Sequence, residues 1–151
     1  MTTVTKIATL AEAPRSEEPH RRLITCYFEE VWNRGRVELL DELLTPDYLN
    51  HSPSTPNPQR GPEGLKPIVR AMRDAVPNLH YEILDLICSA DKAAIFLRVT
   101  GTHTGDLFGM APQGRSFDVR QMQIEWIRDG RIDQHWRVTD ELLWLRQIGQ
   151  L

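Results

Sequence analysis

The chain has 151 residues, of which 40% are hydrophobic and 26% charged, and its formal net charge is -3 at pH 7. These values are typical of one compact soluble domain, and no apolar run approaches the roughly 20 residues that a membrane-spanning helix needs. A slightly acidic chain without a basic block predicts neither a nucleic acid nor an anionic membrane as partner, and it favours a small hydrophobic molecule.

Residues 1–15 lack the continuous apolar core of a secretory signal, so a cytoplasmic protein is expected. We predict a flexible arm over 1–15, which alternatively adds a short helix or a dimer contact, and a single domain over 16–151. The two cysteines, Cys26 and Cys88, fall in a predicted helix and a predicted strand. We expect buried thiols in a reducing compartment, with no disulfide and no metal site.

The first half of the chain is predicted to be helical. From the candidate N-cap Ser16 to Gly35, apolar side chains recur every three or four residues. A short helix is expected over 37–44, and another from Pro62 to about Pro77. The first helix presents an apolar stripe of Leu23, Ile24, Tyr27, Phe28, Val31 and Trp32.

The second half is predicted to form two antiparallel hairpins. The first joins residues 79–89 to 92–103, with Leu86 opposite Ile95, Leu84 opposite Leu97 and Glu82 opposite Val99. A glycine-rich loop follows, and the second hairpin joins residues 116–127 to 131–138. The chain closes with a short helix capped by Asp140. Helices on one face of a four-stranded antiparallel meander make an α+β fold.

The register of the second hairpin decides which side chains share a face. A two-residue loop, Asp129-Gly130, would mix apolar and polar residues on each face, whereas a three-residue loop with Gly130 in a bulge pairs Trp126 with Ile132 and separates them. We therefore expect the three-residue loop. It gathers one polar face, which looks either at solvent or into a ligand cavity. That face contains Gln121, Gln123, Glu125, Asp133, His135 and Arg137.

Six segments between Leu23 and Leu151 have a familiar order and spacing: YFEEVWNRG, LLTPDYLNHSP, RGPEGLK, GTHTGDLFGMAPQGRSF, WIRDGRIDQHW and LLWLRQIG. They resemble the SnoaL-like polyketide cyclases (ester cyclases) of the nuclear-transport-factor-2-like superfamily. The resemblance implies an α+β fold like that of ketosteroid isomerase, in which a cone-shaped, curved antiparallel sheet packs against N-terminal helices around a largely apolar pocket. It also implies a homodimer through the outer sheet face, at Met122, Ile124, Trp126 and Trp136.

Family cyclases close a ring by intramolecular aldol condensation without metal or cofactor, and the resemblance implies the same here. Their acid/base is an aspartate directly after the tryptophan of the last strand. This chain has Arg137 there, and a guanidinium with a pKa above about 12 is no base near neutral pH. The remaining acid/base candidates are His135, His103 and Asp140. Arg137 is a candidate holder of an enolate oxygen or a carboxylate.

Each candidate also has a structural explanation. Asp140 is explained by helix capping and His103 by a backbone contact in the glycine-rich loop, whereas Glu125 and Asp133, near the hairpin turn, are expected to be solvated charges. The predicted substrate-binding residues are Trp32, Tyr48, Asn50, Phe28, Met110, Gln121 and Gln123. Among these, Trp32, Asn50, Gln121 and Gln123 rest on the family resemblance.

The sequence therefore predicts a cofactor-free tailoring enzyme that cyclises or isomerises a polyketide-like or other hydrophobic secondary metabolite. Two alternatives remain open at this stage. One is a noncatalytic small-molecule-binding or dimeric regulatory protein on the same fold. The other is an epoxide-opening hydrolase or cyclase that uses a carboxylate to activate water.

Overall fold

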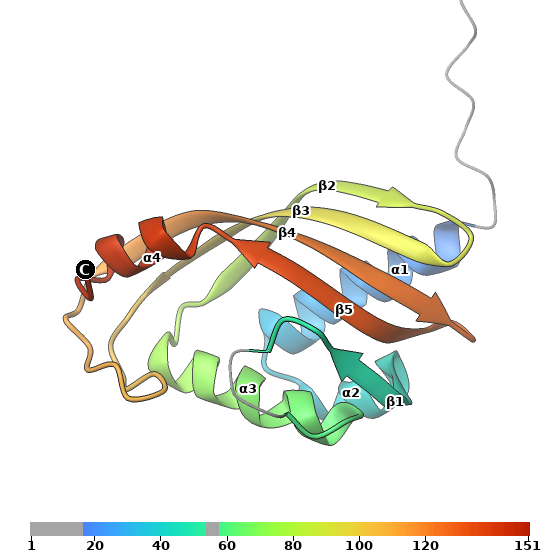
Figure 1. Ribbon diagram of the computed structural model, residues 1–151, viewed down its shortest axis with the longest axis horizontal. Helices are drawn as coiled ribbons and strands as arrows, with labels where there is room; N and C mark the ends of the chain where they lie inside the picture. The colour runs from blue at the N-terminus through green and yellow to red at the C-terminus, as the bar shows by residue number, and fades with distance from the viewer. Residues whose placement is uncertain (1–16, 54–57) are drawn as a thin grey trace, which may run out of the picture.

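The computed structural model describes residues 17–53 and 58–151. A five-stranded sheet of order β1-β5-β4-β3-β2 curves over the helices α1, α2 and α3, and α4 packs against β4 near the C-terminus (Figure 1). The predicted arm over 1–15 and the predicted N-cap Ser16 lie outside the described residues. The α+β class and the helix-covered curved sheet are confirmed.

The first helix changes its hydrogen-bonding pattern midway. The α-helix α1 (Glu18–Cys26) continues into a π-helical segment, η1 (Tyr27–Trp32), in which the Asn33 N–H donates to the Phe28 carbonyl at 2.9 Å. Such π-helical turns are frequent at functional sites. The predicted apolar stripe is buried in full, and η1 places Tyr27, Phe28, Val31 and Trp32 in the core within six residues.

The other predicted helices are also present. The short 3-10 turn η2 (Val37–Leu39) leads into α2 (Leu40–Leu43), and α3 (Pro62–Ala75) starts at the predicted proline. α4 (Glu141–Gln147) is capped as expected, because the Leu143 N–H donates to the Asp140 side chain at 3.1 Å.

The sheet contains one strand that the sequence did not reveal. β1 (Leu44–Asn50) pairs in parallel with β5 (Arg131–Thr139), so the sheet is mixed and has five strands, and the expected antiparallel four-strand meander is incomplete. Pro46 cannot donate to a neighbouring strand, and it is tolerated because β1 is an edge strand. Its partner strand, β5, is also far away in sequence, so no local sequence pattern predicts the pairing.

The first hairpin pairs β2 (His80–Cys88) with β3 (Lys92–Thr102). Leu86 lies opposite Ile95, as predicted. An irregularity between Ile83 and Asp85 then shifts the register by one residue, so the two predicted pairings beyond it are wrong. The shift places Tyr81 opposite Val99 with its side chain buried.

The predicted register of the second hairpin, between β4 (Ser116–Arg128) and β5, is wrong in detail. The loop has two residues, Asp129 and Gly130, both with positive φ, and a bulge then leaves Asp133 unpaired before Trp126 meets Gln134. The bulge achieves the separation of faces that the three-residue loop was expected to give. Five of the six residues predicted to share a polar face do so on the inside of the curved sheet: Gln121, Gln123, Glu125, His135 and Arg137. Asp133 does not join them, because it lies in the bulge and bonds Arg128 and Thr45.

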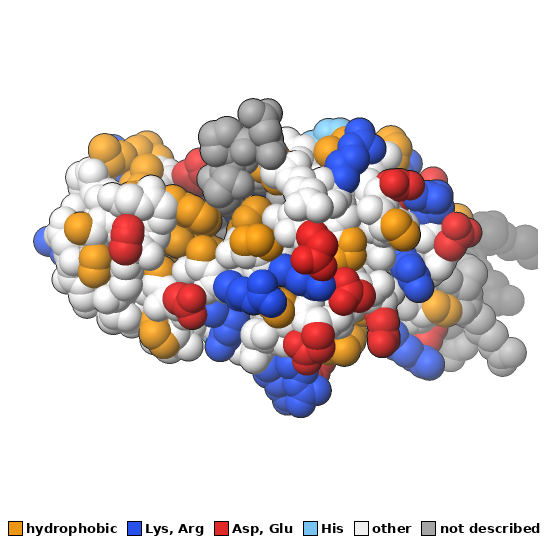
Figure 2. Space-filling model, turned by 90° about the horizontal axis from the view of Figure 1, so that it is seen from below, with side chains coloured by type: hydrophobic (Ala, Val, Ile, Leu, Met, Phe, Trp, Pro, Cys, Tyr) orange, Lys and Arg blue, Asp and Glu red, His pale blue; other side chains and the backbone are white. Residues whose placement is uncertain are grey.

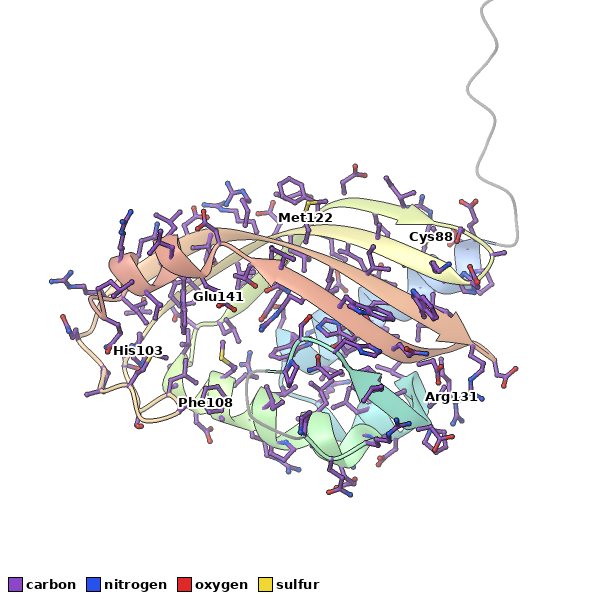
Figure 3. The ribbon with its side chains drawn as sticks, viewed as in Figure 1. Cys88, His103, Phe108, Met122, Arg131 and Glu141 are labelled. Carbon is purple, nitrogen blue, oxygen red and sulfur yellow. The ribbon has the colours of Figure 1, made fainter. Side chains whose placement is uncertain are left out.

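Between Gln121 and Trp126, the two faces of β4 have inverted polarity. On the concave face, which looks at the helices, Gln121, Gln123 and Glu125 are buried. On the convex face Met122 is 59% exposed, Ile124 45% and Trp126 40%. Figure 3 shows Met122 on the side of the sheet away from the helices. Cys26 and Cys88 are both free, and Cys88 is buried as expected whereas Cys26 is only partly so.

Candidate functional site

A connected row of polar side chains crosses the concave face of the sheet. Thr139 donates to Gln121 at 3.0 Å, Gln121 donates to Gln123 at 2.7 Å, and Gln123 donates to Glu125 at 2.5 Å. Each glutamine amide donates its N–H to the next residue, so the donors of Thr139, Gln121 and Gln123 all point towards the Glu125 carboxylate. We call the buried residues Gln121, Gln123, Glu125 and His135 the polar row.

The polar row ends in a buried acid and a histidine. Glu125 is completely buried and its Oε1 lies 2.7 Å from Nδ1 of His135, which is 6% exposed. An ionised carboxylate only accepts hydrogen bonds, so we assign the imidazole proton to Nδ1. That tautomer leaves Nε2 with a lone pair. The expectation that Glu125 is a solvated charge is therefore wrong, because Glu125 alternates with the buried Gln121 and Gln123 on the concave face, which looks at the helices.

A small inner pocket of about 30 Å³ lies against the polar row, with room for about one water molecule. Beside it lies an outer chamber of about 350 Å³, the size of a small-molecule site. The two cavities share Met72, Tyr81, Gln121 and Arg137, so a small polar pocket and a wider, more apolar chamber lie side by side.

The inner pocket is built by η1, the end of β1 and the polar row. Its polar lining residues are Asn50, Ser52, Gln121, Gln123, His135 and Arg137, and its aromatic ones are Tyr27, Phe28, Trp32 and Tyr81. Two of the polar residues, Asn50 and Ser52, are positioned by β1, the strand that the sequence did not reveal. Asn50 pairs with His135 across the sheet, and the Ser52 hydroxyl accepts the backbone N–H of Arg137 at 2.8 Å.

The outer chamber lies between the sheet, α3, α4 and the glycine-rich loop. Leu107, Phe108 and Met110 line it from the loop, and Phe117 and Trp144 line it from β4 and α4. Seen from the side of α3, hydrophobic side chains gather in a recess at the loop end of the molecule (Figure 2). The chamber is therefore open to an apolar ligand.

Phe108 adopts a backbone conformation that is rare for a bulky residue. Its φ is 49°, and its side chain is half exposed although it lines the chamber. Phe108 lies on the helical side of the sheet (Figure 3). Backbone strain of this kind persists where the surrounding structure holds it, often beside a ligand.

Arg137 lies where the two cavities meet. Its nearest described carboxylate is that of Glu141, at 3.9 Å, and it makes one long hydrogen bond of 3.4 Å to the Ser52 carbonyl. Elsewhere Arg98 binds Asp118 at 2.6 Å and Arg128 binds Asp133 at 2.8 Å. Arg137 thus carries a charge into the cavity without a close carboxylate among the described residues.

Burial sets the protonation of the tyrosines around the polar row. Desolvation raises the pKa of Tyr81 to about 12, and the nearby Arg137 charge opposes this shift. Desolvation also raises the pKa of Tyr27 and of Tyr48, and the Glu125 charge adds to both shifts. All three phenols are therefore neutral at ordinary pH and are available as hydrogen-bond donors.

Two predicted acid/base residues lie outside the cavity. Asp140 caps α4, and His103 is fully buried without lining either cavity. The His103 ring has no hydrogen-bond partner among the described residues, so the expected side-chain contact with the loop backbone is absent, and only its main chain bonds, to Arg115 and Gly114. Asp133 is paired with Arg128 and Thr45 and is not a solvated charge.

The predicted substrate-binding residues fall into three places. Phe28, Trp32, Asn50, Gln121 and Gln123 line the inner pocket, Met110 lines the outer chamber, and Tyr48 is buried without lining either.

Tyr81 and Ser52 are site residues that the sequence did not indicate, and Glu125 was placed on the polar face but expected to be a solvated charge. The Asn33 side chain fixes the position of Tyr81, because it accepts the Tyr81 backbone N–H at 2.7 Å and donates to the Tyr81 carbonyl at 2.9 Å. The alternation of Gln121, Gln123 and Glu125 was the available signal for the buried acid.

No helix in the described part of the chain is long and apolar enough to cross a membrane. Across residues 17–53 and 58–151, no three histidine, cysteine or acidic side chains cluster as metal ligands would.

A curved sheet that closes over helices, with a polar inner end to an apolar cavity, defines the class of NTF2-like small-molecule enzymes. The family model described as SnoaL-like polyketide cyclase matches residues 22–148, and the chain belongs to this family.

Curated relatives and solved structures agree with this assignment. The chain is 31% identical to an aklanonic acid methyl ester cyclase of Streptomyces peucetius over 80% of this chain and 85% of the relative. It is 30% identical to the nogalonic acid methyl ester cyclase of Streptomyces nogalater over 79% and 90% of the two chains. The structure of TsrD from Streptomyces laurentii superposes with a TM-score of 0.81 at 31% identity, covering 93% of this chain and 100% of that one.

Proposed function

We propose that this protein cyclises or isomerises a hydrophobic polyketide-like metabolite by acid/base chemistry, with His135 as the base. One observation carries the proposal: the imidazole of His135 lines the cavity while its Nδ1 is held by the buried Glu125 carboxylate, 2.7 Å away. The pair orients the ring and stabilises the positive charge that the ring gains when it takes a proton.

The proposed reaction is an aldol ring closure. Nε2 of His135 takes a proton from a carbon next to a carbonyl, and the released electron pair forms an enolate. The enolate carbon then attacks a second carbonyl of the same molecule and forms the ring bond, and the new alkoxide takes the proton back from His135. The positive charge of Arg137, at the junction of the cavities, stabilises the negative charge that develops in these steps.

The position of the other candidates supports His135. His103 and Asp140 do not line the cavity, so neither has access to a bound substrate there. Epoxide opening would need a carboxylate that activates water, and the two carboxylates considered for it, Asp133 and Asp140, are occupied by an ion pair and a helix cap. The noncatalytic alternative becomes an outcome of the test below.

Aklanonic acid methyl ester, named for the relative in Streptomyces peucetius, is a suitable first substrate. The protein is incubated with it in D2O. Chromatography separates the ring-closed product from the ester, which has the same mass, and mass spectrometry follows deuterium exchange into the remaining ester next to the carbonyl. We expect both in the wild type. His135→Gln should slow both by about 10²- to 10⁴-fold, the contribution of a positioned base.

Matched variants control this experiment. His80→Gln removes an exposed histidine at the start of β2 and should leave both rates unchanged. Turnover that survives His135→Gln but is lost in His103→Gln would contradict the assignment of the base. Binding of the ester without deuterium uptake or ring closure in the wild type would favour the noncatalytic alternative.

We also propose that the convex face of the sheet pairs two copies of the chain. Met122, Ile124 and Trp126 stand exposed there beside Trp136, and Trp126 and Trp136 contact each other with ring centroids 4.9 Å apart. An apolar stripe on a strand that buries its polar side chains is suited to a self-complementary contact. The oligomeric state in solution tests this directly.

A further inference from the structure

We infer that Arg137 binds a carboxylate of the substrate, so that this protein prefers a free polyketide-like acid to the corresponding methyl ester. The inference deepens the proposed function, on which its place in catalysis rests, by naming the substrate class. It stands on three properties of Arg137: its position, its burial and the distance to its nearest counterion.

Arg137 lies between the two cavities and is within reach of a molecule bound in either of them. The residue lines both the inner pocket and the outer chamber, next to Met72, Tyr81 and Gln121, which also line both. It pairs with Gln123 across the sheet and follows His135 by two residues on the same face. A group held by Arg137 therefore lies beside the proposed base.

The burial of Arg137 calls for a negative partner. Its side chain is 24% exposed, and the nearest described carboxylate, that of Glu141, lies 3.9 Å away and is itself 67% exposed. Arg98, which is more exposed at 43%, binds Asp118 through two nitrogens with contacts down to 2.6 Å. A partly desolvated guanidinium without such a partner is best satisfied by an anion from the ligand.

Glu125 does not serve as that partner. Its Oε1 is occupied by Gln123 and His135, and no contact with Arg137 lies within 4 Å. Glu125 does not line either cavity, whereas the Arg137 guanidinium lines both. Arg137 therefore orients a molecule with one carboxylate, with its charged end at Arg137 and its apolar body in the outer chamber.

The same contact assists the proposed reaction. Removal of a proton beside a free carboxylate places two negative charges close together, which disfavours the enolate. Pairing with Arg137 neutralises the first charge before the second develops. The curated relatives are named for methyl esters, in which this first charge is absent.

Binding of an unreactive matched pair tests the inference without turnover. The probes are anthraquinone-2-carboxylate and its methyl ester, whose affinities for the full chain are measured by calorimetry at low and at moderate salt. We expect the acid to bind roughly 10- to 100-fold more tightly, the range that one charge-assisted contact gives, and added salt to weaken the acid alone.

Variants assign the preference to one residue. Arg137→Gln should remove it, Arg137→Lys should keep part of it, and the control Arg98→Gln on the convex face should leave it intact. Equal or tighter binding of the ester by the wild type overturns the inference, and so does a preference that survives Arg137→Gln. If neither Arg137 variant folds, the wild-type comparison of acid and ester still decides. If the protein prefers the acid but no deuterium uptake is seen, the proposed base is wrong and the carboxylate-binding site at Arg137 is still supported.

Discussion

The concave and convex faces of the sheet share the same strands but differ in every physical property. Inside, Gln121, Gln123 and Glu125 are buried and hydrogen-bonded to one another, whereas outside, the alternating residues Met122, Ile124 and Trp126 are exposed to solvent. Antiparallel sheets usually bury apolar residues and expose polar ones. The inversion is what the two proposals require of β4, a polar surface for a small molecule inside and an apolar surface for a second copy of the chain outside.

The charges on the two faces are also handled differently. On the convex face Arg98, Asp118 and Arg120 form a solvated ion-pair network, which contributes little to stability. On the concave face Glu125 is completely buried and is balanced by hydrogen bonds and by His135. A change to a buried charge on the concave face should therefore alter the free energy of unfolding more than a change to a solvated charge on the convex face.

The largest expected effect on stability comes from Glu125→Ala. Loss of this carboxylate leaves Gln123 and His135 without their acceptor in a buried place and opens a cavity, at a cost of about 3 kcal/mol of unfolding free energy. Glu125→Gln keeps an acceptor oxygen and should cost under about 1 kcal/mol. Urea unfolding of both, beside the exposed control Glu29→Ala, measures the difference. Equal stability of all three would mean that the polar row contributes nothing to folding.

Ile124→Lys should disrupt the proposed dimer contact on the convex face and leave the concave face unchanged. A charge in the middle of an apolar contact is desolvated without a partner, so we expect the dimer to dissociate at least tenfold more readily, by about 1.4 kcal/mol or more. Sedimentation over a range of concentrations measures this. A wild type that is monomeric throughout would remove the proposed dimer.

Alkaline pH should lower the stability of the fold by ionising the buried Tyr81 phenol, which lies on the concave side of the sheet. The pKa of Tyr81 is raised from 10.0 to about 12, so the folded state favours the neutral phenol. This stability is complete below pH 10.0 and is lost as the pH rises towards about 12. By about pH 11 the loss for one such group is about 1 kcal/mol. Tyr81→Phe should therefore lose less stability between pH 8 and 11 than the wild type, and identical declines would contradict the burial of this phenol.

The smallest effect is expected at acid pH on the convex face. Hydrogen bonds from Arg98 hold the pKa of Asp118 at about 2, below its usual value of 3.8. The ion pair therefore stabilises the fold above pH 3.8 and is lost as the pH falls towards 2. Asp118→Asn should make acid unfolding slightly less steep there, and 1 M salt should have a similar effect in the wild type. An acid limb unchanged by either would show that the pair is irrelevant to stability.

Local patterns explain most of what the sequence predicted correctly. The apolar stripe ending at Trp32, the cap at Asp140 and the alternation along β4 each depend on neighbours within a few residues. The polar side chains of β4 were predicted to share one face with His135 and Arg137, and they do.

Long-range pairing and irregular backbone explain what the sequence did not reveal. β1 binds β5 almost ninety residues away, with Leu44 opposite Ile132. The bulge at Asp133 replaces a longer loop, which alternation alone does not distinguish. Glu125 shares its face with Gln121 and Gln123, as alternation predicted, but its burial depends on the helices that cover the concave face, which no pattern within β4 reveals.

The central claim is that Glu125 acts through His135, and a double-mutant cycle on turnover tests it most directly. The kcat of the wild type is compared with those of Glu125→Gln, His135→Gln and the double variant, each checked for folding. We expect a loss in each single variant and a double variant no slower than His135→Gln alone, because a positioning residue has no role once the base is gone. Fully multiplicative losses, or a His135→Gln variant within twofold of the wild type, would contradict it.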